Sequence, residues 1–372
     1  MANLVDTASS WLAARGSVIG QGHIKHNLKC QDANAWLVLP ENPAWGVAVV
    51  SDGAGSCANS DRGSERIATK ASELFTDLLR RQGWADGEQL PDTASWTDMA
   101  RATLRAVADD LRFYADSQSL DFHSLSATVI VVVFGPIGLL VANVGDGRAA
   151  AQRLDGSWQA IMTPFRGEEV NATVFLTSNI WAPDRVDKFV GADVYRSSFR
   201  AFALLSDGCE MATFALSRFD EDANRYESLN EPYPPFFDPN VAALIGLHKQ
   251  RKTEDEINQL WKQLLTNGIQ RLADEPDDKT IILAVNLKLI DVPIPATAAN
   301  QVTEAPNVDG AKLTSHAEVV EPIPVPELEK LKAEIQPAFT APKQEVKKII
   351  VQRGGTGKLK QQKQDKYKKH RK

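Results

Sequence analysis

Cysteine is scarce in this chain, which has three cysteines among its 372 residues. Cys30, Cys57 and Cys209 are odd in number and far apart, so the sequence argues against a disulfide framework and favours a reducing compartment. His23, His26 and Cys30 lie close together in the sequence but lack a fourth ligand, so ordinary loop histidines are favoured over a zinc site.

Long apolar runs are missing as well. The longest, residues 127–144, is interrupted by Gly135-Pro136 and Gly138, and it therefore predicts two strands joined by a turn rather than a membrane span. The first 16 residues lack the charged start and the continuous apolar core of a signal peptide. Hydrophobic residues make up 43% of the chain, which is enough for a sizeable core. We expect a cytoplasmic protein with no membrane partner.

Positive charge is concentrated at one end. The net charge is −6, but residues 343–372 contain 12 lysines and arginines against 2 acids, so the first 342 residues carry −16. An acidic body would attract divalent cations, whereas the basic end would act separately. Because Tyr367 is the only aromatic residue in that end, we expect docking to an acidic partner rather than specific nucleic-acid binding.

Composition also divides the chain into three parts. We predict one globular domain over residues 1–290, followed by a linker over residues 291–342 that is rich in Pro, Ala, Glu and Val. The linker and the basic tail, residues 343–372, bury too little apolar surface to order themselves, so both are predicted to be disordered. Residues 326–335 have the pattern of a short docking helix.

The apolar patterns within residues 1–290 predict strands and helices in mixed order. Predicted strands cover 12–19, 34–39, 45–51, 127–134, 138–144, 148–153, 201–206 and 280–287. Predicted helices cover 64–82, a stretch that begins with Thr97 as N-cap, and 253–272, which starts with a capping box at Thr253. Strand pairs with short turns, separated by grouped helices, favour antiparallel sheets with helices packed outside.

The most informative feature is a set of aspartates at the ends of apolar strands. They are Asp32, Asp52, Asp146, Asp207 and Asp277. Any one of them could be a turn or cap residue. An acid at the end of a buried strand is costly unless it is paired, and a divalent cation is a common partner. Carboxylates without a Cys/His cluster favour Mg²⁺ or Mn²⁺ over zinc. The set predicts a metal-centred active site.

The order of the motifs carries a family resemblance. The segments GQGHIKHNLKCQDA, VAVVSDGAGS, SATVIVVV, VANVGDGRAA, GEEVNATVFLT, LLSDGCEM and DDKTIILAV cover roughly residues 15–287. In this order they resemble the metal-dependent protein phosphatases of type 2C (PPM), in the compact bacterial form. The resemblance implies an α+β fold, a four-layer sandwich in which two antiparallel β-sheets are flanked by α-helices, with residues 1–290 as the catalytic domain.

The resemblance also implies a two-metal site. Two Mn²⁺ or Mg²⁺ ions would activate a water molecule that attacks the phosphorus in line, and Asp32 and Asp52 would take part in this catalysis. The implied metal ligands are Asp32 through water, Asp52 as the bridge, the carbonyl of Gly53, Asp207 and Asp277 on one ion, and Asp146 on a weaker third ion.

Three positions depart from the family pattern. Asn27 stands where most relatives have a phosphate-binding Arg, Ala54 stands where a His can protonate the leaving oxygen, and Asp278 replaces the usual Asn and adds negative charge. His23 or His26 is the candidate replacement for the general acid, and we name His23 as the third catalytic residue. The basic side chains near Asn27 that could bind phosphate are His23, Lys25, His26 and Lys29.

We therefore predict a cytoplasmic Mn²⁺/Mg²⁺-dependent protein serine/threonine phosphatase. Its substrates would be phosphorylated proteins, and by resemblance it would oppose a partner Ser/Thr kinase. The alternative is a pseudophosphatase scaffold that binds phosphoproteins or a kinase without turnover, which the departures at Asn27 and Ala54 favour. The full set of aspartates argues against that alternative. A third hypothesis, hydrolysis of small phosphate esters, shares the same metal chemistry, and only a comparison of substrates separates it from the first.

Overall fold

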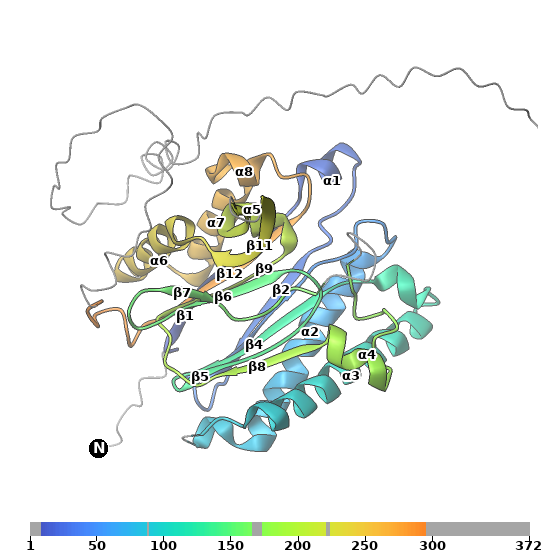
Figure 1. Ribbon diagram of the computed structural model, residues 1–372, viewed down its shortest axis with the longest axis horizontal. Helices are drawn as coiled ribbons and strands as arrows, with labels where there is room; N and C mark the ends of the chain where they lie inside the picture. The colour runs from blue at the N-terminus through green and yellow to red at the C-terminus, as the bar shows by residue number, and fades with distance from the viewer. Residues whose placement is uncertain (1–8, 88, 166–172, 221–223, 295–372) are drawn as a thin grey trace, which may run out of the picture.

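The computed structural model describes residues 9–87, 89–165, 173–220 and 224–294. The predictions for residues 291–342 and 343–372 therefore lie outside the described residues, apart from residues 291–294. Figure 1 shows two sheets that lie face to face, with helices covering the outer side of each.

The two main sheets each contain five strands, and every neighbouring pair is antiparallel. The first sheet has the order β1 (Trp11–Val18), β12 (Lys279–Asn286), β9 (Ala201–Leu205), β6 (Arg148–Gln152) and β7 (Trp158–Ala160). The second has the order β2 (Ala33–Val38), β3 (Gly46–Ser51), β4 (Val129–Gly135), β5 (Gly138–Val144) and β8 (Gly191–Tyr195). The eight strands expected from the sequence are all present within two residues of their expected ends.

The helices form the outer layers (Figure 1). The helices over the second sheet are α2 (Ser60–Gln82), α3 (Thr93–Ser117) and α4 (Pro183–Phe189), and those over the first are α5 (Glu210–Thr213), α6 (Pro234–Lys249), α7 (Glu254–Gln263) and α8 (Gln270–Ala273). A short helix α1 (Gln21–Lys25) and a hairpin of β10 (Phe214–Asp220) and β11 (Arg225–Pro232) complete the described part. The predicted α+β four-layer sandwich is confirmed. None of the described helices is both long and apolar enough to span a bilayer.

Strand β4, in the centre of the second sheet, is packed on both of its faces. Its side chains alternate between two cores: Val129, Val131 and Val133 pack towards the helices, whereas Ile130, Val132 and Phe134 pack between the sheets. A buried aromatic cluster fills the space between the sheets, where the rings of Phe134 and Trp36 stack at 4.4 Å. Strands packed on both faces hold their ends in fixed positions, and the candidate site depends on those ends.

The predicted start of the second long helix was wrong. Helix α3 begins at Thr93 rather than after Thr97, and its N-cap is Asp92, whose side chain accepts a hydrogen bond from Ser95 N at 2.9 Å. Thr97 lies inside the first turns, where its hydroxyl donates to Thr93 O. Both Thr and Asp are good N-caps, and the polar stretch before the apolar stripe conceals which one begins the helix.

The other helices were predicted in part. Helix α2 begins at Ser60, four residues before the predicted start at residue 64. The capping box of Thr253 and Glu256 is confirmed, but the helix that it begins ends at Gln263 and passes into a π-helical turn, Leu264–Gly268, before α8. Helix α6, which the sequence did not predict, begins with two prolines and contains Pro239, a residue that disfavours a helix interior.

Candidate active site

The ends of the strands bring the five aspartates to one end of the sandwich. Asp32 precedes β2, Asp52 follows β3, Asp146 lies in the turn between β5 and β6, Asp207 follows β9 and Asp277 precedes β12 by two residues. The antiparallel register places them together, because Ala33 pairs with Ser51 and Arg148 pairs with Leu205. Every metal-ligand residue predicted from the sequence therefore lies at the same end.

The carboxyl groups interact strongly with one another. A hydrogen bond joins Asp52 and Asp207, and burial together with repulsion from Asp32 and Asp207 holds the pKa of Asp52 well above its usual range. Burial raises the pKa of Asp32 to about 7, although a hydrogen bond from Ser206 opposes the shift. Burial and the nearby Asp146 carboxylate raise the pKa of Asp207 to about 6. A site in which carboxylates destabilise each other's ionised form is one that a cation would relieve.

Hydroxyl groups hold two of these carboxylates in place. Ser206 Oγ donates to Asp32 Oδ2 at 2.7 Å, and Thr173 Oγ1 donates to Asp146 Oδ2 at 2.9 Å. Thr128 instead accepts from the backbone, because Asp52 N donates to its Oγ1 at 3.1 Å. Sequence reasoning missed Ser206, although its position directly before Asp207 in LLSDG was a usable signal.

Small residues let the backbone approach the site closely. Gly53 forms a bridge with Ala127, and a Cβ at Gly53 would lie 2.4 Å from the carbonyl oxygen of Gln31. Gly145, beside Asp146, has φ +114, a conformation that L side chains rarely adopt. Glycine is therefore required at both positions.

Asp278 ties the first loop of the chain to the start of β12. Its Oδ1 accepts from Gly20 N at 2.7 Å, and its Oδ2 accepts from Gln31 N. The side chain is 1% exposed, and its charge contributes to the raised pKa of Asp32. The sequence indicated only the added negative charge, whereas in the structure each oxygen of this carboxylate accepts a hydrogen bond from a different segment of the chain.

His23 lies next to the aspartates. It is 9% exposed, its Nδ1 lies 2.9 Å from Asp278 Oδ1 without the alignment of a hydrogen bond, and its Nε2 lies 4.0 Å from Asp277 Oδ1. A Cβ at Gly55, in the loop after Asp52, would lie 3.8 Å from Nε2, so this nitrogen faces the site.

The other basic groups of this loop are directed to solvent. Lys25, His26 and Lys29 are exposed, and Lys29 Nζ pairs with Asp61 at 3.4 Å. Asn27, the position of the missing arginine, has φ +55 and is exposed. Of the basic residues considered for phosphate binding, His23 is the one that the fold buries beside the aspartates.

The donors fit a hard divalent cation. Within the described residues, no three His, Cys, Asp or Glu side chains close around one point as a finished ligand shell. The available donors are carboxylate oxygens and the Gly53 carbonyl, which are the ligands that Mg²⁺ and Mn²⁺ prefer. Burial and mutual repulsion raise the pKa values of Asp32, Asp52 and Asp207, and a bound cation would offset that repulsion.

Comparisons with known proteins identify the class of protein to which this fold and its acidic end belong. The protein phosphatase 2C family matches residues 19–265. Serine/threonine-protein phosphatase 3 of Escherichia coli (strain K12) is 28% identical over 283 residues, which span 74% of this chain and 98% of that protein.

Solved structures give further similarities. Phosphatase Stp1 from Staphylococcus aureus has 16% identity and a TM-score of 0.45, and covers 77% of this chain and 98% of its own. The catalytic domain of the serine/threonine protein phosphatase PstP, solved with 2 manganese ions, has 16% identity and a TM-score of 0.44, and covers 74% of this chain and 97% of its own.

Since the family match spans most of the chain, the protein belongs to the protein phosphatase 2C family of metal-dependent serine/threonine phosphatases. The family and the enzyme class expected from the sequence are confirmed. A phosphorylated protein is accordingly the class of substrate.

The repulsion within the site predicts a stability gain when one carboxylate is removed. In the presence of EDTA at pH 8, Asp207→Asn should raise the free energy of unfolding by about 1–3 kcal/mol, because the pKa of Asp207 lies at about 6 in the folded state and near its ordinary value when unfolded. The ionised group destabilises the fold above pH 6, so the gain should shrink as the pH falls towards 4. Urea unfolding at several pH values measures both effects.

The matched control is Asp116→Asn, which alters an exposed aspartate of α3 and should change stability by less than about 0.5 kcal/mol. A loss of stability in Asp207→Asn at pH 8, or a gain of equal size at pH 4 and pH 8, would contradict the repulsion.

Proposed function

We propose that this chain is a two-metal protein serine/threonine phosphatase whose catalytic centre is the group of aspartates at the ends of the strands. The observation that carries the proposal is the convergence of five carboxylates at one end of both sheets, three of them with raised pKa values. Bound Mn²⁺ or Mg²⁺ ions would supply an acidified water nucleophile and neutralise the phosphoryl oxygens.

The residues of the chain would divide the binding between them. Asp52 and the carbonyl of Gly53 lie on the turn after β3, from which Asp52 would bridge the two ions. Asp207 is in hydrogen-bond contact with Asp52 and would hold one ion together with Asp277. Asp32, fixed by Ser206, would act through a water molecule.

Asp146 would hold a weaker third ion. Its carboxylate repels Asp207, which supports a position beside the proposed pair, and its own hydrogen bond comes from Thr173, within the stretch GEEVNATVFLT. The part of that stretch before Thr173 lies outside the described residues. A ligand held at the border of the site suits an ion that binds less tightly than the central pair.

The central test is metal-dependent hydrolysis by the full chain. Wild type should release phosphate from p-nitrophenyl phosphate and from a phosphothreonine peptide with Mn²⁺ or Mg²⁺ but not with EDTA. Asp52→Asn should lower both rates by at least about 100-fold, because even the loss of a residue that only supports a metal ligand can cost that much. Mn²⁺ should also raise the melting temperature of the wild type, by mass action, more than that of the variant.

The possible results separate the three hypotheses. Mn²⁺ binding by calorimetry without turnover on either substrate would support the pseudophosphatase scaffold that Asn27 and Ala54 suggest. Turnover of p-nitrophenyl phosphate without turnover of the peptide would support a hydrolase of small phosphates. No thermal shift and no heat of binding with either ion would overturn the metal site itself. Asp116→Asn, the exposed control, should behave as wild type in each assay.

We further propose that His23 assists the leaving group. Ala54 is buried and has no proton to offer, whereas His23 Nε2 faces the site near Asp277. A serine or threonine alkoxide is a poor leaving group that needs a proton, and p-nitrophenolate is not. His23→Gln should therefore slow hydrolysis of the phosphothreonine peptide by about 100-fold, the lower range for a lost general acid, and that of p-nitrophenyl phosphate much less.

The exposed neighbour provides the matched control for this prediction. His26→Gln should leave the ratio of the two rates unchanged, because His26 points to solvent and its Nδ1 contacts Gly22 O. Equal loss on both substrates in His23→Gln would assign His23 to phosphate binding or to structure instead of proton donation.

The partner proposals follow from the chemistry of the substrate. Phosphoserine and phosphothreonine are made by a Ser/Thr kinase, and we propose that this cytoplasmic phosphatase opposes one. In native cells that lack the chain, phosphothreonine and phosphoserine peptides of its targets should rise at least about twofold by quantitative mass spectrometry. Wild type should reverse the rise and Asp52→Asn should not, whereas reversal by both would indicate a scaffold.

We keep the three-part division of the chain as a proposal as well: a catalytic domain over residues 1–290, a Pro/Ala/Glu-rich linker over residues 291–342 and a basic tail over residues 343–372. The 12 basic residues of the tail would dock an acidic partner through charge.

A further inference from the structure

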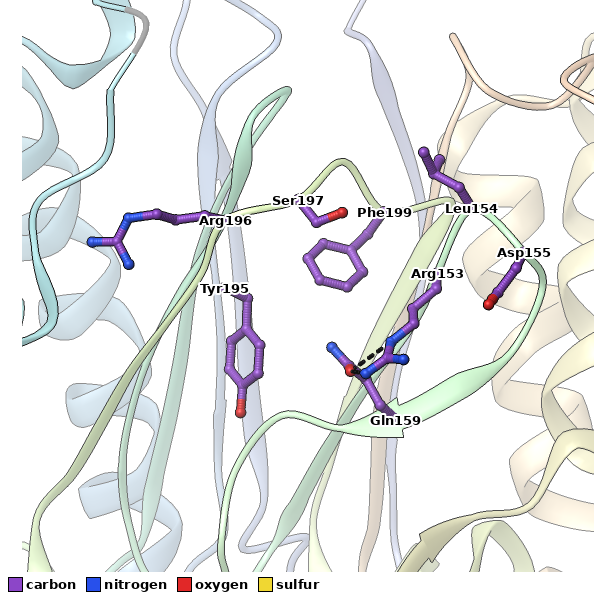
Figure 2. A pocket seen from close by; sticks show the side chains of 8 residues that line it. All are labelled: Arg153, Leu154, Asp155, Gln159, Tyr195, Arg196, Ser197 and Phe199. Carbon is purple, nitrogen blue, oxygen red and sulfur yellow. Dashed lines mark hydrogen bonds between the residues drawn. The ribbon is translucent and has the colours of Figure 1, made fainter.

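A hollow lies at the opposite end of the sandwich from the aspartates. It has a volume of about 440 Å³ and opens between the loop after β6, the edge strand β7 and the end of the edge strand β8 (Figure 2). The register separates it from the catalytic end: Tyr195, in its wall, pairs with Leu139 near the start of β5, whereas Asp146 follows the end of that strand.

The wall of this hollow combines aromatic rings with a guanidinium. Phe199 is 2% exposed, and its ring meets that of Tyr195 edge to face at 6.5 Å. Arg153 Nε donates to Gln159 Oε1 at 2.7 Å, and Figure 2 shows this pair lying across from the Tyr195 and Phe199 rings, whereas Arg196 points away. Gln159 fixes the direction of the guanidinium without neutralising it.

Two neighbouring groups set the polarity of the rim. The carboxylate of Asp155 accepts from both the amide and the hydroxyl of Ser157 within the β6–β7 turn, and it also interacts electrostatically with Arg153. Burial and the nearby Asp193 carboxylate raise the pKa of Tyr195 to about 12, so its hydroxyl stays neutral and can donate. The hollow is therefore suited to an apolar or proline-rich segment that carries a carboxylate beside it.

The chain leaves its described part at this hollow. Arg200 donates to Val292 O at 2.7 Å and also reaches the carbonyl oxygen of Leu154, which lines the hollow. A Cβ at Gly156 would lie 3.0 Å from the side chain of Ile294, the last described residue. Everything that follows in the sequence therefore starts against the β6–β7 turn.

The downstream sequence contains a segment with matching chemistry. Residues 318–329 read EVVEPIPVPELE, with three alternate prolines, four glutamates and no basic residue. Proline-rich segments adopt an extended helix at low entropic cost and pack on aromatic walls. The segment is separated from Ile294 by 23 residues. A flexible linker of that length spans about 25–30 Å and would present the segment to the hollow at an effective concentration in the millimolar range.

We propose that residues 318–329 dock in the hollow of their own chain, with the prolines on the ring of Tyr195, which the buried Phe199 supports from behind, and a glutamate on Arg153. Docking would hold the start of the basic tail, residues 343–372, at the end of the sandwich remote from the catalytic aspartates. It would leave hydrolysis of small substrates unchanged, so a failure of this proposal is distinguishable from a failure of the proposed phosphatase site.

Site-specific photocrosslinking in the full chain tests the docking. Leu154 is 40% exposed on the rim, so p-benzoylphenylalanine in its place should be tolerated. After irradiation, mass spectrometry should find crosslinks from position 154 to peptides within residues 318–329. In an equal mixture of isotope-labelled and unlabelled chains, these crosslinks should stay within one chain. The same probe in place of Phe113, which is 73% exposed on α3, should not reach the segment.

A charge reversal supplies the second arm. Arg153→Glu should lower the yield of the crosslink at least about fivefold, whereas Arg218→Glu, an exposed charge on β10, should not, and both variants should hydrolyse p-nitrophenyl phosphate as wild type does. Crosslinks to other parts of the chain, crosslinks between labelled and unlabelled chains, or none at all would each overturn docking within the chain. An Arg153→Glu yield equal to wild type in a folded variant would overturn the role of the guanidinium.

Discussion

Repulsion between buried carboxylates at one end of the sandwich is the constraint on which the rest of the structure depends. Burial and neighbouring acids raise the pKa values of Asp32, Asp52 and Asp207, so each ionised group makes the fold less stable. Such a cluster persists only if the surrounding structure holds it. Two five-stranded sheets, packed against each other and against helices, provide that rigidity, because their strand ends cannot separate without opening three hydrophobic cores.

The local hydrogen bonds around the aspartates follow from the same constraint. Ser206 reaches Asp32 from β9, and Asp278 collects the amides of Gly20 and Gln31 from the first loop. Each bond joins segments that are far apart in the sequence, so the charged end is also where the sheets and loops are tied together. The Asp278 carboxylate adds to the repulsion on Asp32, but it accepts hydrogen bonds from two backbone amides. Asp278 therefore fixes the loop that carries His23, at the cost of more repulsion among the aspartates.

Much of the fold could be predicted from the sequence because its strands are apolar runs bounded by Gly, Pro or Asp. Four of the five aspartates were predicted as site residues for the same reason, since they directly border such a run. The elements that the sequence did not predict depend on contacts between distant segments. The edge strands β7 and β8 and the hairpin β10–β11 are short or half-exposed, so they lack the apolar signal. Helix α6 begins at prolines and is stabilised by packing of Phe236 and Phe237, which no local propensity shows.

The two ends of the sandwich differ in chemistry, because residues at opposite ends of the same strands are held far apart by the extended backbone between them. Leu139, near the start of β5, pairs with Tyr195 in the wall of the hollow, whereas Asp146 follows the other end of the same strand, among the aspartates. Charges that far apart in a protein at physiological salt are largely screened from one another. An anionic segment can therefore lie at the Arg153 end without competing with the carboxylates for cations. The chain leaves its described part at that end, so the sequence that connects it to the basic residues 343–372 starts away from the aspartates.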